Sequence, residues 1–183
     1  NDVFWTEFLS SHSTFFTTAR TNYITGATTT LLTDGVGLGL AVTAFRQMTS
    51  PSADGTKRIG GVPEILLVPP ELEAAAEGLY VNQNLGAVAT SAANIYANKY
   101  RVVTVAWLSD SAFTGYSTTA WYLLRNPGMM PMVVASFLNG MEAPTVEDSD
   151  ADFDTLGVQF RGYHDFGCDQ AEYLCGIKSK GAA

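Results

Sequence analysis

The sequence predicts an α+β fold, because its helical patterns come early in the chain and its strand patterns come late. Two amphipathic helical patterns lie before residue 80, and five short strand-like stretches follow residue 100. In a doubly wound α/β sheet, helices and strands would alternate instead. The 183 residues are enough for one substantial hydrophobic core, so we expect one compact unit.

The first helical pattern covers residues 34–48, and Asp34 is a suitable cap for its first turn. Its apolar side chains fall on one face and are Leu38, Ala41, Val42, Phe45 and Met48. Upstream, the apolar residues within 2–20 have a spacing compatible with the end of a helix and a following turn.

Three glycines, Gly35, Gly37 and Gly39, lie at the start of this helix. A glycine costs about 1 kcal/mol relative to alanine in a helix interior, so each should have a packing reason. The alternative is a phosphate-binding turn, since glycine-rich turns before helices bind phosphates. The preceding segment is at best a short strand, and Ala41 or Val42 replaces the last glycine of the dinucleotide pattern. Close helix packing is therefore favoured.

A strand followed by a helix is predicted over residues 64–79. Residues 49–62 form a loop or hairpin before it, by their Pro and Gly content. Residues 64–68 are apolar, and Pro70 suits the first turn of a helix. The helix then places Leu72, Ala75, Ala76 and Leu79 on one face.

Later elements are predicted from shorter patterns. One short helix is expected around residues 87–97. The strand candidates are residues 101–108, 120–125, 132–138, 157–165 and 171–178. Residues 167–170 are expected to be a turn between the last two strands.

The charge and composition of the chain limit which functions it can have. The net charge is −8, and the 10 basic residues are scattered, with only Lys57 and Arg58 adjacent, so affinity-driven DNA binding is disfavoured. Only 15% of residues are charged, which suits a subunit whose surface is covered by neighbours.

There is no apolar run of membrane-spanning length and no signal-peptide pattern, so we expect a soluble, unsecreted protein. The start at Asn1 without Met leads us to expect further sequence upstream.

Cys168 and Cys175 are the only cysteines. With residues 167–170 as a turn, Cys168 would lie near the turn and Cys175 well along the return strand, which makes a disulfide geometrically awkward. We expect reduced, buried thiols.

No catalytic or metal-binding set is apparent. Alternating carboxylates in residues 147–154 suggest calcium, but Phe153 and Gln159 occupy the glycine and glutamate positions of an EF-hand. A solvated acidic loop is favoured. Among the histidines His12 and His164, only His164 has candidate partners, Asp165 and Cys168. Neighbours in a strand point to opposite faces, so His164 and Asp165 should diverge.

The last third of the chain carries several motifs in a fixed order. They are Trp121-Tyr122-Leu123-Leu124, Phe137-Leu138-Asn139-Gly140 with Pro144, Phe160-Arg161-Gly162-Tyr163-His164-Asp165-Phe166-Gly167, and Lys178-Ser179-Lys180-Gly181-Ala182. Upstream lies a strand, double proline and helix at residues 65–76. This order resembles the carboxyl-terminal half of tailed-phage major capsid proteins, in their Mu-like and protease-fused branch. The resemblance covers residues 1–183 and is best from Pro63 onward.

The resemblance implies a Hong Kong 97-type fold, with an axial domain around the five- and six-fold axes and a peripheral domain carrying a long helix and a narrow sheet. Residues 1–29 would be the end of the peripheral helix and a connector, 30–155 the axial domain, and 156–183 the return strands of the peripheral domain. The amino-terminal arm, the extended loop and most of the long helix would precede Asn1.

The function implied by the resemblance is structural: self-assembly of the icosahedral head that encloses packaged DNA. Partners would be copies of the chain in pentamers and hexamers, with scaffold, protease and portal proteins, but no specific nucleic-acid sequence and no membrane. The protein would reside in the virion, and in the host cytoplasm before assembly. No cofactor and no catalytic, cofactor-binding or metal residue is assigned, and no enzymatic activity is expected.

Within this reading, large aromatic residues are expected to anchor the core; they are Trp107, Trp121, Phe137 and Phe160. Loops 49–62 and 142–155 are candidate intersubunit or exposed surfaces. Arg125 and Arg161 would pair with carboxylates of neighbouring copies.

Two other functions remain open. A nonviral nanocompartment subunit would share the fold. A monomeric β-rich module would bind ligands through exposed aromatic side chains.

Overall fold

A five-stranded mixed sheet lies at the centre of the computed structural model, which describes residues 2–10, 14–31, 34–51, 57–85, 92–149, 157 and 159–181. The strand order is β1-β11-β6-β2-β5. The strands are β1 (Tyr23–Ile24), β2 (Ile65–Val68), β5 (Arg101–Thr104), β6 (Trp121–Leu124) and β11 (Gly176–Ser179). β6 runs antiparallel to both neighbours, β2 and β11, whereas β1 is parallel to β11 and β5 is parallel to β2.

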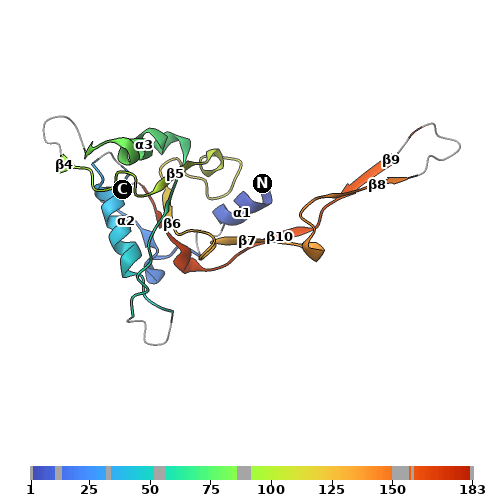
Figure 1. The fold of residues 1–183 in the computed structure, drawn as a ribbon, viewed down its shortest axis with the longest axis horizontal. Coiled ribbons are helices and arrows are strands. Elements are labelled where there is room, and N and C mark those ends of the chain that lie inside the picture. Colours follow the sequence, from blue (N-terminus) through green and yellow to red (C-terminus); the bar gives the residue numbers. More distant parts are fainter. Residues whose placement is uncertain are drawn as a thin grey trace.

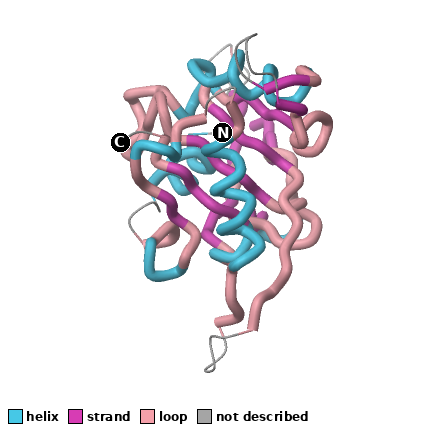
Figure 2. The backbone as a smooth tube through the Cα atoms, turned by 90° about the vertical axis from the view of Figure 1, so that its left-hand side faces the viewer, coloured by secondary structure: helices cyan, strands magenta, loops and turns pink. Residues whose placement is uncertain are grey.

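Three α-helices pack around this sheet: α1 (Asp2–Ser10), α2 (Val36–Gln47) and α3 (Glu73–Val81). α2 lies across the strands on one face (Figure 2). Short 3₁₀ helices connect the elements and span Thr18–Arg20, Ala27–Thr29, Pro70–Leu72, Ala106–Leu108, Leu138–Gly140 and Tyr173–Cys175. A small hairpin pairs β3 (Asn84–Leu85) with β4 (Ala92–Ala93).

A two-stranded ribbon projects from the body formed by the sheet and helices (Figure 1). Its inner part pairs β7 (Val133–Phe137) with β10 (Phe166–Gln170), and its outer part pairs β8 (Thr145–Ser149) with β9 (Gln159–Tyr163). All four strands are antiparallel to their partners. We call residues 133–149 and 159–170 the arm.

The central sheet separates two hydrophobic clusters, because side chains alternate between the faces of a strand. Trp121 and Leu123 face the first cluster, with side chains of α2 and α3. Tyr122 faces the second cluster, with Phe8 and Leu9 of α1. Both faces of β6 are therefore covered, and Trp121, Tyr122 and Leu123 are at most 1% exposed.

Buried hydrogen bonds tie distant segments to the sheet. The Thr29 carbonyl oxygen accepts from Trp121 Nε1 at 3.0 Å and from Ser179 Oγ at 2.8 Å. The fully buried Asn22 side chain donates to the carbonyl oxygens of Phe15 and Tyr173 and accepts from the Thr17 amide. The buried side-chain amide of Asn22 and the buried hydroxyl of Ser179 therefore have hydrogen-bond partners inside the protein, as buried polar groups require.

The predicted elements of the first half are confirmed. α2 buries the predicted apolar face. Its N-cap is Gly35 and not the predicted Asp34, although Asp34 Oδ1 accepts from the Val36 amide at 3.1 Å. The strand and helix at 64–79 appear as β2, a 3₁₀ turn beginning at Pro70, and α3. Thr49 and Arg58 form an isolated antiparallel bridge, and residues 52–56 lie outside the described part.

Gly37 and Gly39 of α2 have the predicted packing reasons, whereas Gly35, which precedes the helix, has a conformational reason. Gly35 adopts a left-handed conformation with φ of 72° at the helix start. A side chain at Gly37 would collide with the Thr30 carbonyl oxygen, and one at Gly39 would meet the Tyr96 hydroxyl. A phosphate-binding role is not needed to explain them.

Four expectations are corrected. In the described part of residues 87–97, β4 and a turn replace the expected helix. Residues 166–170 form strand β10 instead of a turn, because they pair with β7 along the arm. The start of the acidic stretch, Glu147–Ser149, belongs to β8, and residues 150–156 lie outside the described part. Strand β11 begins only at Gly176, after a 3₁₀ turn, and not at residue 171.

The strands predicted at 101–108, 120–125, 132–138 and 157–165 correspond to β5, β6, β7 and β9, with shorter bounds. The central sheet combines strands from all three predicted domain segments: β1 from 1–29, β2, β5 and β6 from 30–155, and β11 from 156–183. Within the described residues, the search for a helix long and apolar enough to cross a bilayer finds none.

Lys178 is a charged side chain placed inside this sheet. It is 8% exposed, and its Nζ lies 5.9 Å from the Tyr23 ring centroid and 5.7 Å from that of Tyr122. Burial lowers the pKa of Lys178 from 10.5 to about 8. The folded state therefore favours the neutral amine more than the unfolded chain does.

Replacing Gly37 by alanine tests the close packing of α2. Alanine normally stabilises a helix interior by about 1 kcal/mol relative to glycine, but at this site the methyl group meets backbone. We expect Gly37→Ala to lower the free energy of unfolding by about 1–3 kcal/mol, measured by urea denaturation. Gly39→Ala is the matched control and should cost less, because Tyr96 can rotate away. Equal stability of Gly37→Ala and wild type would contradict the packing.

The pH dependence of stability tests the burial of Lys178. Between about pH 8 and 10.5 the unfolded chain binds more protons at this site than the folded one, so its contribution to stability rises with pH. Lys178→Met removes this contribution. We expect the variant to be more stable than wild type at pH 7, by up to about 3 kcal/mol, and the difference to shrink as pH rises through this window.

Burial raises the pKa values of Cys175, to about 12, and of Tyr122, so these two groups make stability fall as pH rises. Wild type and Lys178→Met both contain them, so the difference in stability between the two proteins is free of this effect. Thermal unfolding from pH 7 to 10 measures the difference. A difference that does not change with pH would contradict the account.

Candidate assembly surface

The base of the arm is held by α1. Val133 packs in the cluster that contains Phe8, and Gln170 Nε2 donates to Glu7 Oε1 at 2.9 Å. Residues that lie opposite each other on β7 and β10 share a face of the ribbon. Val133 lies opposite Gln170 next to the body, and Phe137 lies opposite Phe166 at the far end of the inner ribbon. The inner ribbon thus leaves the body along α1 before it projects into solvent.

An aromatic cluster lies where the inner ribbon meets the outer ribbon. The His164 ring lies 5.6 Å from the Phe137 ring and 5.0 Å from the Phe166 ring, between centroids. His164 Nε2 is buried and makes no hydrogen bond within the described part of the chain. Cys168 lies farther along β10, opposite Ala135. The structure therefore surrounds His164 with aromatic rings and gives it no hydrogen bond to Asp165 or Cys168 there.

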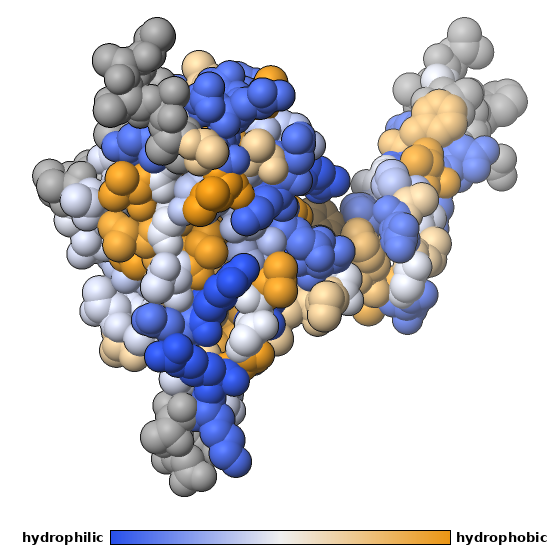
Figure 3. Space-filling view, turned by 60° about the vertical axis from the view of Figure 1, so that its left-hand side comes forward, coloured by the Kyte–Doolittle hydropathy of each residue, from blue (hydrophilic) through white to orange (hydrophobic). Residues whose placement is uncertain are grey.

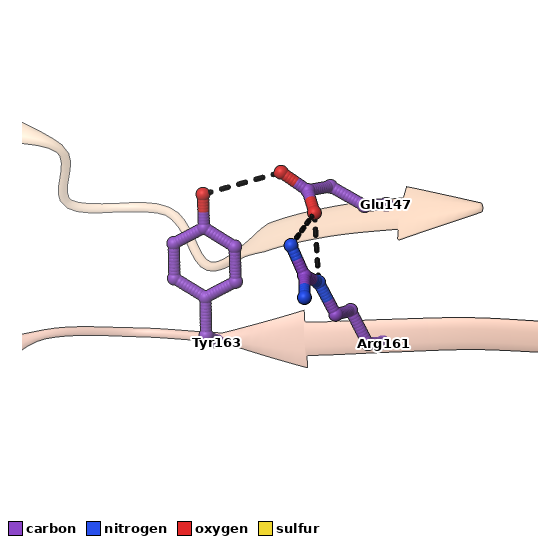
Figure 4. Close-up of polar contacts among 3 residues, drawn as sticks. All are labelled: Glu147, Arg161 and Tyr163. Carbon is purple, nitrogen blue, oxygen red and sulfur yellow. Dashed lines mark hydrogen bonds and ion pairs between the residues drawn. The ribbon is translucent and has the colours of Figure 1, made fainter. Parts of the chain in front are cut away.

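One face of the outer ribbon is polar. Arg161 Nη2 lies 2.6 Å from Glu147 Oε2, and Arg161 Nε donates to the same oxygen at 2.8 Å. The Tyr163 hydroxyl donates to Glu147 Oε1 at 3.4 Å (Figure 4). The three side chains come from β8 and β9 and point to the same side, as their register requires. Arg161, expected to pair with a neighbour, instead pairs within its own chain.

The opposite face of the outer ribbon carries two exposed apolar side chains beside one carboxylate. Val146 is 66% exposed and Phe160 is 70% exposed. Gly162 lies across from Val146, and Asp148 across from Phe160. In Figure 3, apolar atoms appear on the projecting arm beside charged ones. We call Val146, Asp148, Phe160 and Gly162 the apolar arm face.

A ribbon of this kind is poorly stabilised by its own contacts. A two-stranded hairpin is marginally stable in water unless another surface covers it. Both of its edges also offer free backbone groups for pairing. Exposed Phe160 and Val146 add an apolar surface of the type that marks interaction sites. The arm therefore has the properties of a surface that a protein partner covers.

A second apolar surface lies on the body, between α1 and the sheet. It is a groove of about 210 Å³. Phe4, Trp5 and Phe8 of α1 form one wall, and the floor includes Leu67 and Val103. Trp5 also stacks on Trp107, with 5.6 Å between ring centroids. We call this the α1 groove.

The predicted core anchors divide into two groups. Trp121 is fully buried, as expected. Phe160 is on the arm, Trp107 is 37% exposed, and Phe137 is half-buried in the arm, so these three do not anchor the body core. The prediction was wrong because a large aromatic residue suits an interface as well as a core.

The remaining predicted residues lie apart from one another. The Arg125 guanidinium stacks over Phe45 at 5.3 Å, with Nε and Nη2 buried and without a partner among the described residues. Cys168 and Cys175 are free thiols, as predicted, but only Cys175 is buried. His12 lies outside the described residues. In the part of the chain that the structure describes, no cluster of metal-binding side chains occurs.

Sequence reasoning missed strands β8 and β10, and with them the arm. Alternating Thr145, Val146 and Glu147 is a period-two signal for β8, which the acidic residues after it obscured. The α1 groove has no comparable signal, because its walls come from segments far apart in the chain.

Neutralising Glu147 tests how much the ion pair stabilises the arm. The Arg161 and Glu147 side chains are 77% and 43% exposed, so water screens their attraction. We expect Glu147→Gln to change the free energy of unfolding by less than about 1 kcal/mol, measured by urea denaturation at low and high salt. Asp148→Asn, on the opposite face, is the matched control. A loss clearly above that of the control, at both salt concentrations, would contradict this account.

Comparison with known proteins identifies the family. The family model described as "Phage capsid protein" matches residues 1–179, which is nearly the whole chain. The search of curated proteins finds no match. A mixed α and β structure with several sheets is compatible with a capsid fold. The chain therefore belongs to the phage capsid protein family, and its role is that of a structural component of the virion.

Proposed function

We propose that this protein is the subunit that self-assembles into the icosahedral head of a tailed phage or prophage, around packaged DNA. The observation that carries the proposal is the arm: a ribbon that projects from the body with an uncovered apolar face. A monomer gains nothing from such a surface, whereas a shell subunit buries it against neighbours. The family match supports the same role.

The proposed fold is of the Hong Kong 97 type, in its Mu-like and protease-fused branch. The body with its five-stranded sheet would be the axial domain, which meets its copies in pentamers and hexamers. α1 with the narrow sheet of the arm would be the peripheral domain, α1 being the end of its long helix. This proposed division differs from the boundaries predicted from the sequence, which were residues 29 and 155. It assigns β7 and β8 to the peripheral domain, because they pair with β10 and β9, and it assigns β11 to the axial domain, because β11 belongs to the central sheet.

The charge of the protein is compatible with enclosing DNA without binding it tightly. A net charge of −8 repels the phosphate backbone, so the chain would line or form a container and not a DNA-binding site. Assembly in the host cytoplasm, with scaffold, protease and portal proteins, completes the proposal. No enzymatic activity and no cofactor belong to it.

Two alternatives are distinguished by assembly. A nonviral nanocompartment subunit would also form shells, but around a protein cargo. A monomeric ligand-binding module would use the α1 groove and exposed aromatics such as Phe160. Phe160 lies on a thin ribbon and is 70% exposed, whereas the sites that bind small ligands bury most of the ligand among apolar side chains. The capsid role accounts for both surfaces.

The decisive experiment is light scattering combined with negative-stain imaging. It would use this chain and a version that carries whatever sequence precedes Asn1 in its gene. We expect pentamers, hexamers or closed shells. If both versions remain monomers across protein concentrations and salt, self-assembly is wrong and ligand screening of the α1 groove becomes the better course. Shells that package protein cargo instead of DNA in the host would favour the nanocompartment.

A further inference from the structure

We propose that the α1 groove of one copy receives the apolar arm face of a second copy, with Phe160 inside the groove and Asp148 beside Arg101. This inference rests on the proposed self-assembly and specifies one contact that makes it. It is carried by three observations: the size and lining of the groove, the reach of the arm, and the charges beside each surface.

The groove is large enough for an aromatic side chain. Its volume is about 210 Å³, and an apolar cavity of about 150 Å³ already holds a benzene ring. Most of the lining is aromatic or aliphatic, with Phe4 and Trp5 on α1 and Ile65 and Val103 on the sheet, and Arg101 and Arg125 also line the groove. These four residues are only partly buried, so the groove is open to a partner. An apolar ring would find edge and face contacts there.

Phe160 is the side chain suited to this groove. At 70% exposed, it is among the most exposed aromatic residues in the described chain, and Val146 lies on the same face. Gly162, opposite Val146, adds no side chain to this face, so a groove wall can approach the backbone.

The arm cannot fill the groove of its own chain. The outer ribbon of β8 and β9 projects away from the body (Figure 1). The groove is lined by residues of α1 and β2 and by Val133 at the base of the arm. An arm that enters this groove must therefore come from another copy. If each copy donates its arm to one neighbour and receives the arm of another, the contact is heterologous, and it closes into a ring when the rotation between copies closes.

Charges beside the two surfaces are complementary. Arg101 is exposed on the edge strand β5, on the same face as Val103, and lines the groove. Among the described residues no carboxylate pairs with it. Asp148 is exposed directly across from Phe160, while the neighbouring Glu147 is already paired with Arg161. An Asp148–Arg101 pair would orient the arm as Phe160 enters the groove.

Site-directed crosslinking tests the contact. The variant Arg101→Cys/Asp148→Cys is made in a Cys168→Ser background. Cys175 lines the groove but is only 1% exposed, so it should not react, and the Cys168→Ser protein treated in the same way checks this. A short bismaleimide is added under assembly conditions. We expect a ladder of covalent multimers on denaturing gels, because each copy would carry both ends of the contact. Each single-cysteine variant should give no ladder.

Side-chain exchange provides a second measurement that does not depend on the crosslinker. Phe160→Ser should raise the protein concentration needed for assembly about tenfold or more, whereas Tyr116→Ser, which removes an aromatic residue exposed on the body, should not. Arg101→Asp should also weaken assembly, and the swap Arg101→Asp/Asp148→Arg should restore it. Circular dichroism of every variant checks that the body is folded.

The outcomes separate this inference from the proposed function. Particles that form without the ladder, and with Phe160→Ser assembling like wild type, would overturn the groove contact and leave the capsid role intact. A protein that stays monomeric in every version would overturn both. A ladder together with rescue by the charge swap would establish the contact.

Discussion

The antiparallel pairing of β6 with β11 is the interaction on which the rest of the structure depends. It joins Trp121–Leu124 to Gly176–Ser179 in the middle of the sheet. The arm lies between these strands in the sequence, and in it β7 pairs with β10 and β8 with β9. The segment from β6 to β11 is thus one long interrupted hairpin. Its inner end is the best-buried part of the body and its outer end projects into solvent (Figure 1).

This arrangement gives the two ends of the hairpin different sources of stability. β6 is covered on both faces, and Trp121 and Ser179 share the carbonyl oxygen of Thr29. The outer ribbon has one exposed ion pair and an uncovered apolar face, so its own contacts stabilise it little. A rigid base and a weakly stabilised end suit a subunit that completes its packing only when it meets neighbours.

The sequence predicts the elements whose signals are local. The strand, double proline and helix at 64–79 and the helix with Phe45 on its buried face were predicted because the apolar period and the position of Pro70 agree with the structure there. β10 was missed because Gly167 and Asp169 favour turns, whereas their strand conformation depends on pairing with Ser136 and Val134 of β7, which lie far away in the sequence. Phe160 was placed in the core because hydrophobicity alone does not distinguish a core from an interface. The α1 groove depends on tertiary packing and could not be predicted from local pattern.

Hydrogen–deuterium exchange, compared between the unassembled and assembled protein, tests the central claim most directly. The claim is that the arm is anchored by β6 and β11 but stabilised by neighbouring copies. The account predicts slow exchange of the β6 and β11 amides in both states, with fast exchange of the β8 and β9 amides in the free subunit and strong protection after assembly. Equal protection of β8 and β9 in both states, or no protection after assembly, would contradict it.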